Sequence, residues 1–210
     1  EFDDESDVES LVDESEINPN KIQLDVLKDI KNYYENNSIG KFIAACGVGK
    51  SLTSLFISKE INSQCIIIGV PYANLLDQWY DEVLKIYPNY DILIVGGNGT
   101  TNNHEIERFI KLKTRRIIIS TYSSSNIIES ITKKIDFKFD FKIGDEAHHL
   151  ASIKNENSKQ WNIFHNIKSY KSLYMTATEK LIENKTNKLV YSMDNEDIFE
   201  KHICPPISIE

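Results

Sequence analysis

The stretch AACGVGKS, residues 44–51, follows a short apolar run and leads into a segment with helical character. Its two glycines, Gly47 and Gly49, permit the backbone bends that turn N–H groups inward around phosphate oxygens. Lys50 adds a cation for the phosphate groups, and the Ser51 hydroxyl can coordinate Mg²⁺. The pattern departs from G-x-x-x-x-G-K-[ST] only at its first position, where an alanine removes no ligand. We interpret the stretch as a phosphate-binding loop; a glycine-containing turn with an incidental lysine is the alternative.

A second stretch, GDEAHH at residues 144–149, begins where another apolar run ends. An acid at the carboxyl end of a strand, beside a phosphate loop, is placed to hold Mg²⁺ through its water shell, and we assign this role to Asp145. Successive residues of an extended chain point in different directions, so Glu146 can orient and deprotonate an attacking water. We expect His148 to bond to a neighbouring segment and report the nucleotide state. Together the two stretches predict a site that binds Mg-ATP and attacks its terminal phosphate with water.

Short apolar runs rich in β-branched residues recur along the chain at a steady interval, with helical stretches between them. Strands that alternate with helices indicate βαβ units, so we expect an α/β fold with a mostly parallel central sheet flanked by helices. The expected strands are 42–45, 65–70, 91–95, 116–120, 139–143 and 172–175. The expected helices are 24–34, 51–61, 73–86, 104–112, 124–132 and 160–167.

The expected helix 73–86 carries apolar residues close to a period of 3.6, which predicts that one of its faces is buried. These residues are Leu75, Leu76, Trp79, Val83 and Ile86. We interpret Trp79 as an anchor of the core.

The acidic residues are concentrated at the start of the chain. Residues 1–16 hold nine acids and no base, which leaves 23 acids against 24 bases in the remainder of a chain with a net charge of −8. Blocks of like charge repel one another and stay solvated, so we expect residues 1–16 to be a disordered leader. A specific acidic interaction tail is the alternative. Because the remainder is almost neutral, the net charge neither favours nor excludes nucleic acid as a partner.

Three widely spaced cysteines, Cys46, Cys65 and Cys204, fit neither a disulfide framework nor a zinc site. No apolar run approaches about 20 residues, and the chain starts with acids instead of an apolar signal segment. We therefore expect an intracellular protein, in the cytoplasm, the nucleus or a virion, with no membrane partner. The bias toward Ile, Asn and Lys is typical of an AT-rich genome, such as that of a large DNA virus or a protist.

The order of these motifs resembles the first motor lobe of superfamily 2 helicases and translocases, the DEAH-type group, over most of residues 20–200. The phosphate loop is similar to motif I of that family, and residues 144–149 are similar to motif II. Residues 70–79 are similar to motif Ia, residues 119–122 to motif Ib and residues 175–178 to motif III. Residues 192–199 resemble the stretch that leads toward a second lobe.

The resemblance implies a RecA-like ATP-binding lobe at residues 17–200 and the start of a linker to a second lobe at 201–210. The implied contacts with the nucleotide are Gly47, Val48, Gly49, Lys50, Ser51 and Gln23. In the family, a glutamine at the position of Gln23 reads adenine beside an aromatic residue. Here Ile22 stands in the place of the aromatic residue, so we expect a relaxed base preference.

The remaining motifs carry implied roles in coupling and in nucleic-acid binding. Coupling of the nucleotide state to strand binding is implied for His148, Thr176 and Thr178. Contact with the nucleic-acid backbone is implied for Pro71, Tyr72, Gly97, Thr121 and Tyr122. Contacts of this kind position a strand without reading its sequence. For Thr121 and Tyr122, a role in capping a helix is the alternative.

The family's second lobe supplies catalytic arginines, whereas this chain has only Arg108, Arg115 and Arg116. We therefore expect the chain to be a fragment that is nearly inactive by itself. The implied function is the ATP-driven motor of a helicase or translocase. The alternatives are a nucleotide-dependent nucleic-acid-binding switch and the motor of a restriction or remodelling complex. The Asp-Glu-Ala-His variant with Thr-Ala-Thr looks more like DNA translocases than RNA helicases, which favours DNA as the partner.

Overall fold

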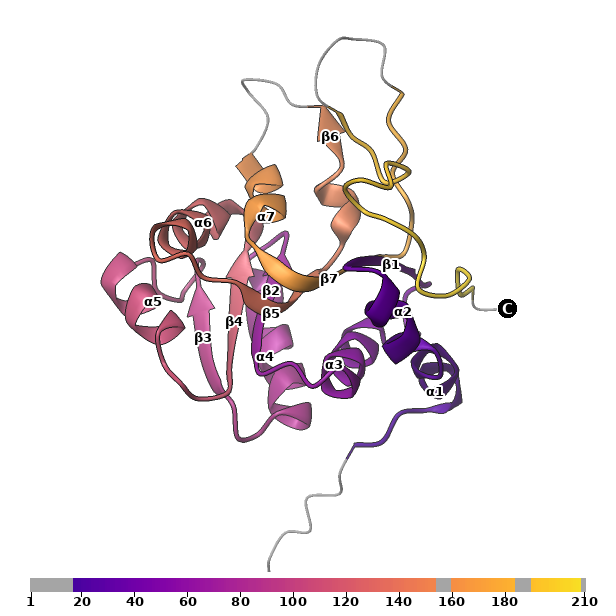
Figure 1. Ribbon diagram of the computed structural model, residues 1–210, viewed down its shortest axis with the longest axis horizontal. Helices are drawn as coiled ribbons and strands as arrows, with labels where there is room; N and C mark the ends of the chain where they lie inside the picture. The colour runs from indigo at the N-terminus through magenta and orange to yellow at the C-terminus, as the bar shows by residue number, and fades with distance from the viewer. Residues whose placement is uncertain (1–16, 154–159, 184–189, 209–210) are drawn as a thin grey trace, which may run out of the picture.

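The computed structural model describes residues 17–153, 160–183 and 190–208, so the acidic leader at 1–16 lies outside the described part of the chain. One six-stranded sheet forms the centre of the fold, in the strand order β1-β7-β5-β2-β4-β3 (Figure 1). Its strands are β1 (Ile39–Ile43), β2 (Cys65–Val70), β3 (Asp91–Val95), β4 (Arg116–Thr121), β5 (Phe139–Gly144) and β7 (Ser169–Thr176). All neighbouring strands are parallel. The predicted α/β fold with a mostly parallel sheet is confirmed.

Helices, 3-10 turns and a short pair of strands complete the described part of the fold. The α-helices are α1 (Lys21–Leu27), α2 (Ile30–Asn36), α3 (Lys50–Glu60), α4 (Asn74–Ile86), α5 (Asn103–Ile110), α6 (Ser125–Lys134) and α7 (Ile163–Asn166). Three 3-10 turns, η1 (Tyr122–Ser124), η2 (Ala147–His149) and η3 (Gln160–Asn162), follow strands or precede helices. Strands β6 (Ser152–Ile153) and β8 (Val190–Tyr191) form a separate antiparallel pair. Within the described ranges, no helix combines the length and the apolar character needed to cross a membrane.

Both faces of the sheet are covered by helices, as β2 illustrates. Ile66 and Ile68 pack into a core that they share with α1 to α4. Ile67 lies between them in sequence and packs into a second core with α5, α6 and α7. All three side chains are fully buried. Because helices cover both faces of the sheet, the central strand β2 is a continuous apolar run and does not alternate with polar residues.

Two predicted helices differ from the structure. The single helix expected at 24–34 is two helices, because Asp29 leaves helical backbone geometry between α1 and α2 (φ −109°, ψ 6°). The two helices have different anchors. Gln23 of α1 donates to the Gly49 carbonyl of the phosphate loop, while the Tyr34 hydroxyl of α2 donates to the Ser172 carbonyl of β7. The helix expected at 160–167 consists of η3 and the short helix α7.

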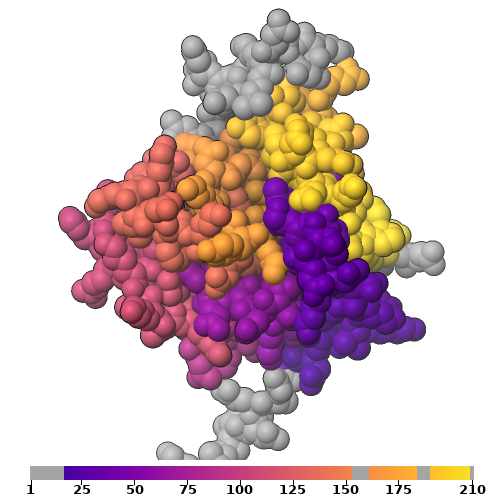
Figure 2. Space-filling view, viewed as in Figure 1, coloured from indigo at the N-terminus to yellow at the C-terminus, as the bar shows by residue number. Residues whose placement is uncertain are grey.

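The segment 201–207 runs parallel to the edge strand β1 and bonds to it. The Lys41 N–H donates to the Lys201 carbonyl at 2.9 Å, and the Ile207 N–H donates to the Ile43 carbonyl at 3.0 Å. Figure 2 shows this C-terminal part, in yellow, against the indigo N-terminal elements. The residues expected to begin a linker therefore pack against the edge of this lobe.

The parallel sheet decides where the motifs meet. The phosphate loop follows β1, the GDEAHH stretch follows the end of β5, and the stretches similar to motifs Ia and Ib end β2 and β4. Because all of these strands run in the same direction, their carboxyl ends lie at one edge of the sheet. Ligands of open α/β sheets bind at this edge.

Lys142 ties α7 to the sheet from inside the protein. Its ammonium donates to the carbonyls of Phe164, His165 and Ile167, at 3.3, 3.0 and 2.9 Å. Burial lowers the pKa of Lys142 to about 7, since a charged group loses its hydration there. The three carbonyl acceptors oppose this effect in part because they favour the protonated form.

We predict that Lys142 makes the stability of the protein rise with pH above neutrality. Between pH 7 and 10 the unfolded chain retains a proton that the folded chain releases, so the free energy of unfolding should rise by at most about 1.4 kcal/mol per pH unit. Lys142→Met should remove this slope. Urea unfolding of the unaltered protein and of Lys142→Met between pH 7.5 and 9.5 measures both free energies of unfolding. The contributions of other titrating groups cancel in the difference between the two proteins. Parallel curves for the two proteins would show that Lys142 does not titrate in this range.

Candidate nucleotide site

The phosphate loop connects β1 to α3 with two residues in the left-handed region of backbone space. Gly47 has φ 86° and Gly49 has φ 84°. The positive φ of Gly49 favours glycine, and a Cβ atom there would lie 2.9 Å from the Gln23 amide nitrogen and displace that side chain. Gly49 directly precedes α3, whose unpaired N–H groups and positive dipole end therefore face the loop.

Lys50 and Ser51 form the first turn of α3. The Lys50 ammonium donates to the Ala44 carbonyl at 3.2 Å, a bond within the loop itself. Both residues line a cavity of about 360 Å³, together with Cys46, Gly47, Gly49, Leu52, Leu75, Gln78, Glu82, Asp145 and Glu146. The predicted phosphate loop and the predicted acids thus share one cavity. Val48 is buried and is not among the residues that line the cavity.

Gln23 supports the phosphate loop through a hydrogen bond to Gly49. It is 4% exposed, and its side-chain oxygen accepts the Asn20 N–H at 2.9 Å as part of a capping box. Its amide nitrogen donates to the Gly49 carbonyl at 3.4 Å. Gln23 is not among the residues that line the cavity. The structure therefore gives Gln23 a role in holding the loop, and its contact with adenine stays a prediction.

Asp145 is held rigidly at the end of β5. Its carboxylate accepts the indole N–H of Trp79 at 2.8 Å and the N–H of Glu146 at 2.9 Å. Burial raises the pKa of Asp145 to about 6, and the bond from Trp79 opposes this rise. The charge of Glu146 raises the pKa further, whereas the charge of Lys50 lowers it. The acid is therefore fixed in orientation, and its ionisation depends on its neighbours.

Glu146 occupies a strained position. Its φ of 46° places a non-glycine residue in the left-handed region, which costs roughly 1–2 kcal/mol. The turn lets the side chain leave the strand direction and reach the cavity. Strained residues of this kind persist where the surrounding structure fixes them, and they concentrate at functional sites.

The structure brings the predicted coupling residues together around Glu146. The Thr176 hydroxyl lies 3.3 Å from the Glu146 carboxylate and 2.8 Å from Nδ1 of His148. Nδ1 of His148 is also 3.3 Å from the same carboxylate. Thr178 joins through its backbone N–H, which donates to the Thr176 hydroxyl at 3.3 Å. Motifs II and III are thus linked directly at the acid that faces the cavity.

The donor set fits magnesium. In the described part of the chain, no three His, Cys, Asp or Glu side chains are arranged to hold a metal ion by themselves. Mg²⁺ is commonly bound by one or two protein oxygens, by substrate phosphates and by retained waters. The Ser51 hydroxyl and the Asp145 carboxylate are hard oxygen ligands in the cavity of the phosphate loop. They could hold the ion only together with a phosphate ligand.

The predicted nucleic-acid contacts lie at the carboxyl ends of β2, β3 and β4. Tyr72 is 48% exposed, and Gly97 is exposed beside the start of α4. Pro71 is buried. The Thr121 hydroxyl is also buried, 3.0 Å from each of two neighbouring serine hydroxyls.

The prediction for the Tyr122 side chain needs correction. Tyr122 is 0% exposed, and its hydroxyl donates to the Asp145 carbonyl. The ring packs against Phe164. A side chain that is buried and hydrogen-bonded in this way does not contact nucleic acid; it supports the strand end that carries Asp145.

Two functional features were missed by the sequence analysis. Trp79 is an anchor of the core, as interpreted, but its indole N–H also reaches Asp145. The available signal was chemical, because a buried indole N–H requires an acceptor. The second feature is an aromatic cluster in which Tyr72 contacts His149 and Trp161, with ring centroids 5.3 and 5.8 Å apart. His149 in turn contacts His148 at 4.2 Å, so the exposed Tyr72 is linked to the coupling residues.

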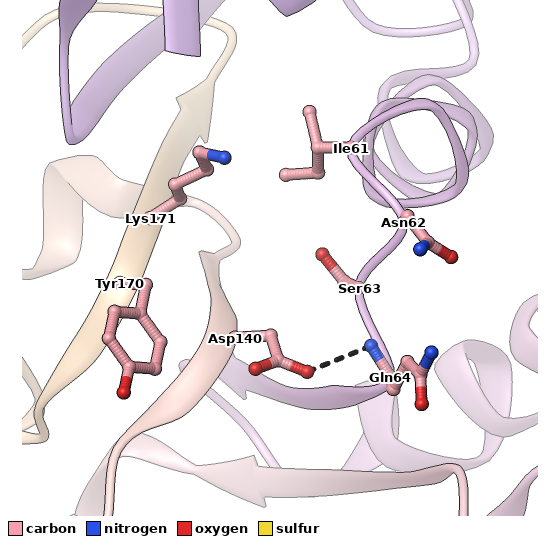
Figure 3. A pocket seen from close by; sticks show the side chains of 7 residues that line it. All are labelled: Ile61, Asn62, Ser63, Gln64, Asp140, Tyr170 and Lys171. Atoms are coloured by element: carbon pink, nitrogen blue, oxygen red, sulfur yellow. Dashed lines mark hydrogen bonds between the residues drawn. The ribbon is translucent and has the colours of Figure 1, made fainter. Parts of the chain in front are cut away.

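A larger cavity, of about 450 Å³, lies at the opposite edge of the sheet (Figure 3). The Asp140 carboxylate in this cavity accepts the N–H groups of Gln64 and Cys65, both at 2.9 Å. Asp140 thereby satisfies the backbone at the start of β2. Neither the phosphate loop nor the acids Asp145 and Glu146 line this cavity, so we place the candidate site in the smaller cavity.

The arginines lie away from the phosphate loop. Arg116 starts β4, at the amino edge of the sheet, and donates to the carbonyls of Thr114 and Ile110, both at 2.8 Å. Arg115 lies 6.0 Å above the Tyr90 ring at the same edge. None of the chain's arginines lines the cavity of the phosphate loop, and among the described residues that line it Lys50 is the one with a cationic side chain.

Comparison with known proteins decides the family. The family model for the Type III restriction enzyme, res subunit, matches residues 16–181, which is more than half of the chain. The chain belongs to this family. Its membership agrees with the resemblance to superfamily 2 motors and with a RecA-like lobe, while the DEAH subtype stays a prediction.

The similar curated proteins are much longer than this chain. A Plasmodium falciparum protein named "Probable ATP-dependent helicase" is 29% identical over 177 residues, covering 81% of this chain and 8% of the relative. The ISWI chromatin-remodeling complex ATPase ISW2 of Saccharomyces cerevisiae is 29% identical, covering 80% of this chain and 15% of the relative. The chain thus corresponds to a small part of these relatives.

Two solved restriction enzymes share the fold. The ATP-dependent Type ISP restriction-modification enzyme LlaBIII, bound to DNA, superposes with a TM-score of 0.70 at 26% identity, covering 89% of this chain and 15% of that one. A nuclease-deletion mutant of the Type ISP enzyme LlaGI, with a DNA substrate mimic, gives a TM-score of 0.72 at 23% identity, covering 92% and 20%.

We predict that Trp79→Phe weakens the binding of Mg-nucleotide at mildly acidic pH. Without the indole donor, the pKa of Asp145 should rise above about 6, by just under one unit for a bond of about 1 kcal/mol. Nucleotide binding in the presence of Mg²⁺, titrated from pH 5 to 8, should therefore show a midpoint at higher pH. Trp161→Phe is the matched control, and the titration of the nucleotide itself cancels between variants. Identical midpoints for both variants would contradict the role of Trp79.

Proposed function

We propose that this chain is the ATP-binding motor lobe of a nucleic-acid translocase, in which ATP hydrolysis drives movement along DNA. The observation that carries the proposal is the meeting of the phosphate loop with Asp145 and Glu146 in one cavity. The bonds of Glu146 to Thr176 and of Thr176 to His148 support it, because they join the acid to a second motif.

In this proposal the loop binds the phosphates through its N–H groups and the start of α3. Phosphate oxygens replace the Ala44 carbonyl as the acceptor for Lys50. Ser51 and Asp145 hold Mg²⁺, which supplies positive charge for the developing charge on the phosphates. Because the pKa of Asp145 is about 6, this acid is ionised at neutral pH and suited to the role.

Glu146 is the proposed general base. Its carboxylate accepts a proton from the attacking water as the water oxygen bonds to the terminal phosphorus. The bond between that phosphorus and its bridging oxygen breaks, which leaves ADP and inorganic phosphate. His148 and Thr176 fix the carboxylate that faces the water, so a shift of either would change the rate of hydrolysis. Such a link allows nucleic-acid binding to control hydrolysis.

The carboxyl edge of β2, β3 and β4 is the proposed nucleic-acid track. Tyr72 and Gly97 are its exposed residues, and Tyr72 reaches the coupling residues through His149. Pro71 and Thr121 are buried beneath this surface, and we propose that they position its exposed residues. DNA is favoured over RNA because two solved relatives were determined with DNA or a DNA substrate mimic.

Translocation is the proposed output of the motor. The relatives are named as restriction enzymes, chromatin-remodelling ATPases and a probable ATP-dependent helicase, so these names support an ATP-driven motor, and the motor of a restriction or remodelling complex is the second candidate. These names also support an intracellular location. A nucleotide-dependent switch without movement is the remaining alternative. A triplex-displacement assay tests translocation in a protein that carries both lobes. A translocase should displace the third strand from duplex DNA without separating the two strands of the duplex.

We predict that Lys50→Ala and Glu146→Gln separate binding from turnover in a protein that carries both lobes. Lys50→Ala should weaken Mg-ATP binding several-fold or more, because the described lining of the cavity loses the one cationic side chain that it has. Glu146→Gln should retain binding and lose roughly 10²–10⁴ in turnover, the usual worth of a general base. Calorimetry and phosphate release measure the two effects. Unchanged affinity in Lys50→Ala would remove the loop assignment, and full turnover in Glu146→Gln would remove the base.

We predict that the 210-residue chain by itself binds nucleotide weakly and hydrolyses ATP negligibly. No arginine lines the cavity, and an arginine finger is worth about 10³–10⁵ in rate in related systems. We propose that a second RecA-like lobe supplies this cation. Phosphate release by the purified chain, with and without DNA, is the measurement. Robust DNA-stimulated hydrolysis that Lys50→Ala abolishes would show that the chain needs no second lobe.

A further inference from the structure

A buried tyrosine that follows β4 reaches across the sheet to the acids of the nucleotide site. Tyr122 is 0% exposed, and its hydroxyl donates to the Asp145 carbonyl at the end of β5. Strand β2 lies between β4 and β5 in the sheet, so the Tyr122 side chain has to pass over the end of β2 to make this bond. The local sequence provides the space for this crossing.

Two glycines leave the room that the Tyr122 ring occupies. Gly69 of β2 is in register with Ser120 of β4 on one side and with Gly144 of β5 on the other. A Cβ atom at Gly69 would lie 2.7 Å from the Tyr122 ring, and a Cβ atom at Gly144 would lie 3.3 Å from its hydroxyl oxygen. Side chains at these positions would therefore press on the ring or on its polar end.

The Tyr122 hydroxyl acts on the peptide group that joins Asp145 to Glu146. The carbonyl of this planar group accepts from Tyr122, and its N–H, which belongs to Glu146, donates to the Asp145 carboxylate at 2.9 Å. Burial raises the pKa of Tyr122 well above its usual value, so the hydroxyl keeps its proton at neutral pH and remains a donor. The plane of the peptide is therefore fixed at both of its polar atoms.

The fixed peptide holds the backbone of Glu146 in its strained conformation. The φ angle of Glu146 describes the rotation between this peptide plane and the rest of the residue, and it is 46°. On the other side of the residue, the Glu146 carbonyl accepts the His149 N–H at 2.9 Å. A strained residue persists only where its surroundings fix it. Without the bond from Tyr122, the peptide can rotate, and Glu146 can relax to a conformation in which its carboxylate points elsewhere.

We propose that Tyr122 is a positioning residue for ATP hydrolysis, because its hydroxyl fixes the peptide before Glu146 and thereby directs the Glu146 carboxylate toward the attacking water. The inference rests on the proposed function, in which Glu146 is the general base. Turnover should depend on the Tyr122 hydroxyl, whereas nucleotide binding should not. The phosphate loop lies outside this contact, and the Asp145 carboxylate keeps its bond from Trp79.

The test is Tyr122→Phe in a protein that carries both lobes, since this substitution removes the hydroxyl and keeps the ring. Turnover at saturating Mg-ATP should fall about 5–30-fold, which is the population change that corresponds to the strain of a left-handed residue. The affinity for Mg-ATP, measured by calorimetry, should stay close to that of the unaltered protein. Circular dichroism selects a temperature at which each variant is folded.

A second measurement separates the positioning of Glu146 from a general loss of structure. In a Glu146→Gln background the base is absent, so adding Tyr122→Phe should cause no further loss of turnover under single-turnover conditions. Tyr174→Phe is the matched control. Tyr174 of β7 is also buried, and its hydroxyl bonds to the His165 ring at 3.0 Å instead of the Asp145 carbonyl. This control should leave turnover unchanged.

Unchanged turnover in Tyr122→Phe overturns this inference alone. The inference also fails if Tyr174→Phe reproduces the loss, or if the affinity for Mg-ATP falls in parallel with turnover. An equal loss from Tyr122→Phe in the Glu146→Gln background would show that the hydroxyl does not act through Glu146, and it overturns the inference too. Failure of the unaltered two-lobed protein to hydrolyse ATP overturns the proposed function as well.

Discussion

The common direction of the six sheet strands is the constraint on which the site depends. The phosphate loop and the acids are about 100 residues apart in sequence, and they follow β1 and β5, which are separated in the sheet by β7. Only strands that all run the same way bring these ends to one edge. Helices on both faces bury the centre of the sheet, and this burial lets a central strand such as β2 be a continuous apolar run. A rigid sheet holds loops with the precision that phosphoryl transfer requires.

Burial of charge near this edge gives the site its chemical character. Asp145 is an acid in a shielded position, and it keeps its place through the indole N–H of Trp79 in α4 and the backbone N–H of Glu146. Lys142 lies in β5, the strand that Asp145 follows, and its buried ammonium holds α7 against the sheet. Both groups have pKa values moved toward neutrality by loss of hydration. The ionisation of both groups therefore depends on the protein that surrounds them.

The contacts around Glu146 connect the nucleotide cavity with the exposed edge of the lobe. Thr176 and His148 touch the acid, and aromatic contacts continue from His148 through His149 to Tyr72. A ligand that moves Tyr72 would disturb packed rings and, through them, the hydrogen bonds of the acid. The chain thus contains a physical connection between the proposed nucleic-acid track and the proposed site of hydrolysis, within a single lobe.

The sequence by itself determined the βα alternation, the phosphate loop and the acidic strand end, because each depends on residues that are close together along the chain. Hydrophobic runs and glycine spacing are local signals of this kind. The break between α1 and α2, the burial of Tyr122 and the bond from Trp79 to Asp145 depend on contacts between distant segments, and only the tertiary structure decided them. Spacing along the chain predicts which groups are present, whereas burial and partners, which set their charge and orientation, arise from packing.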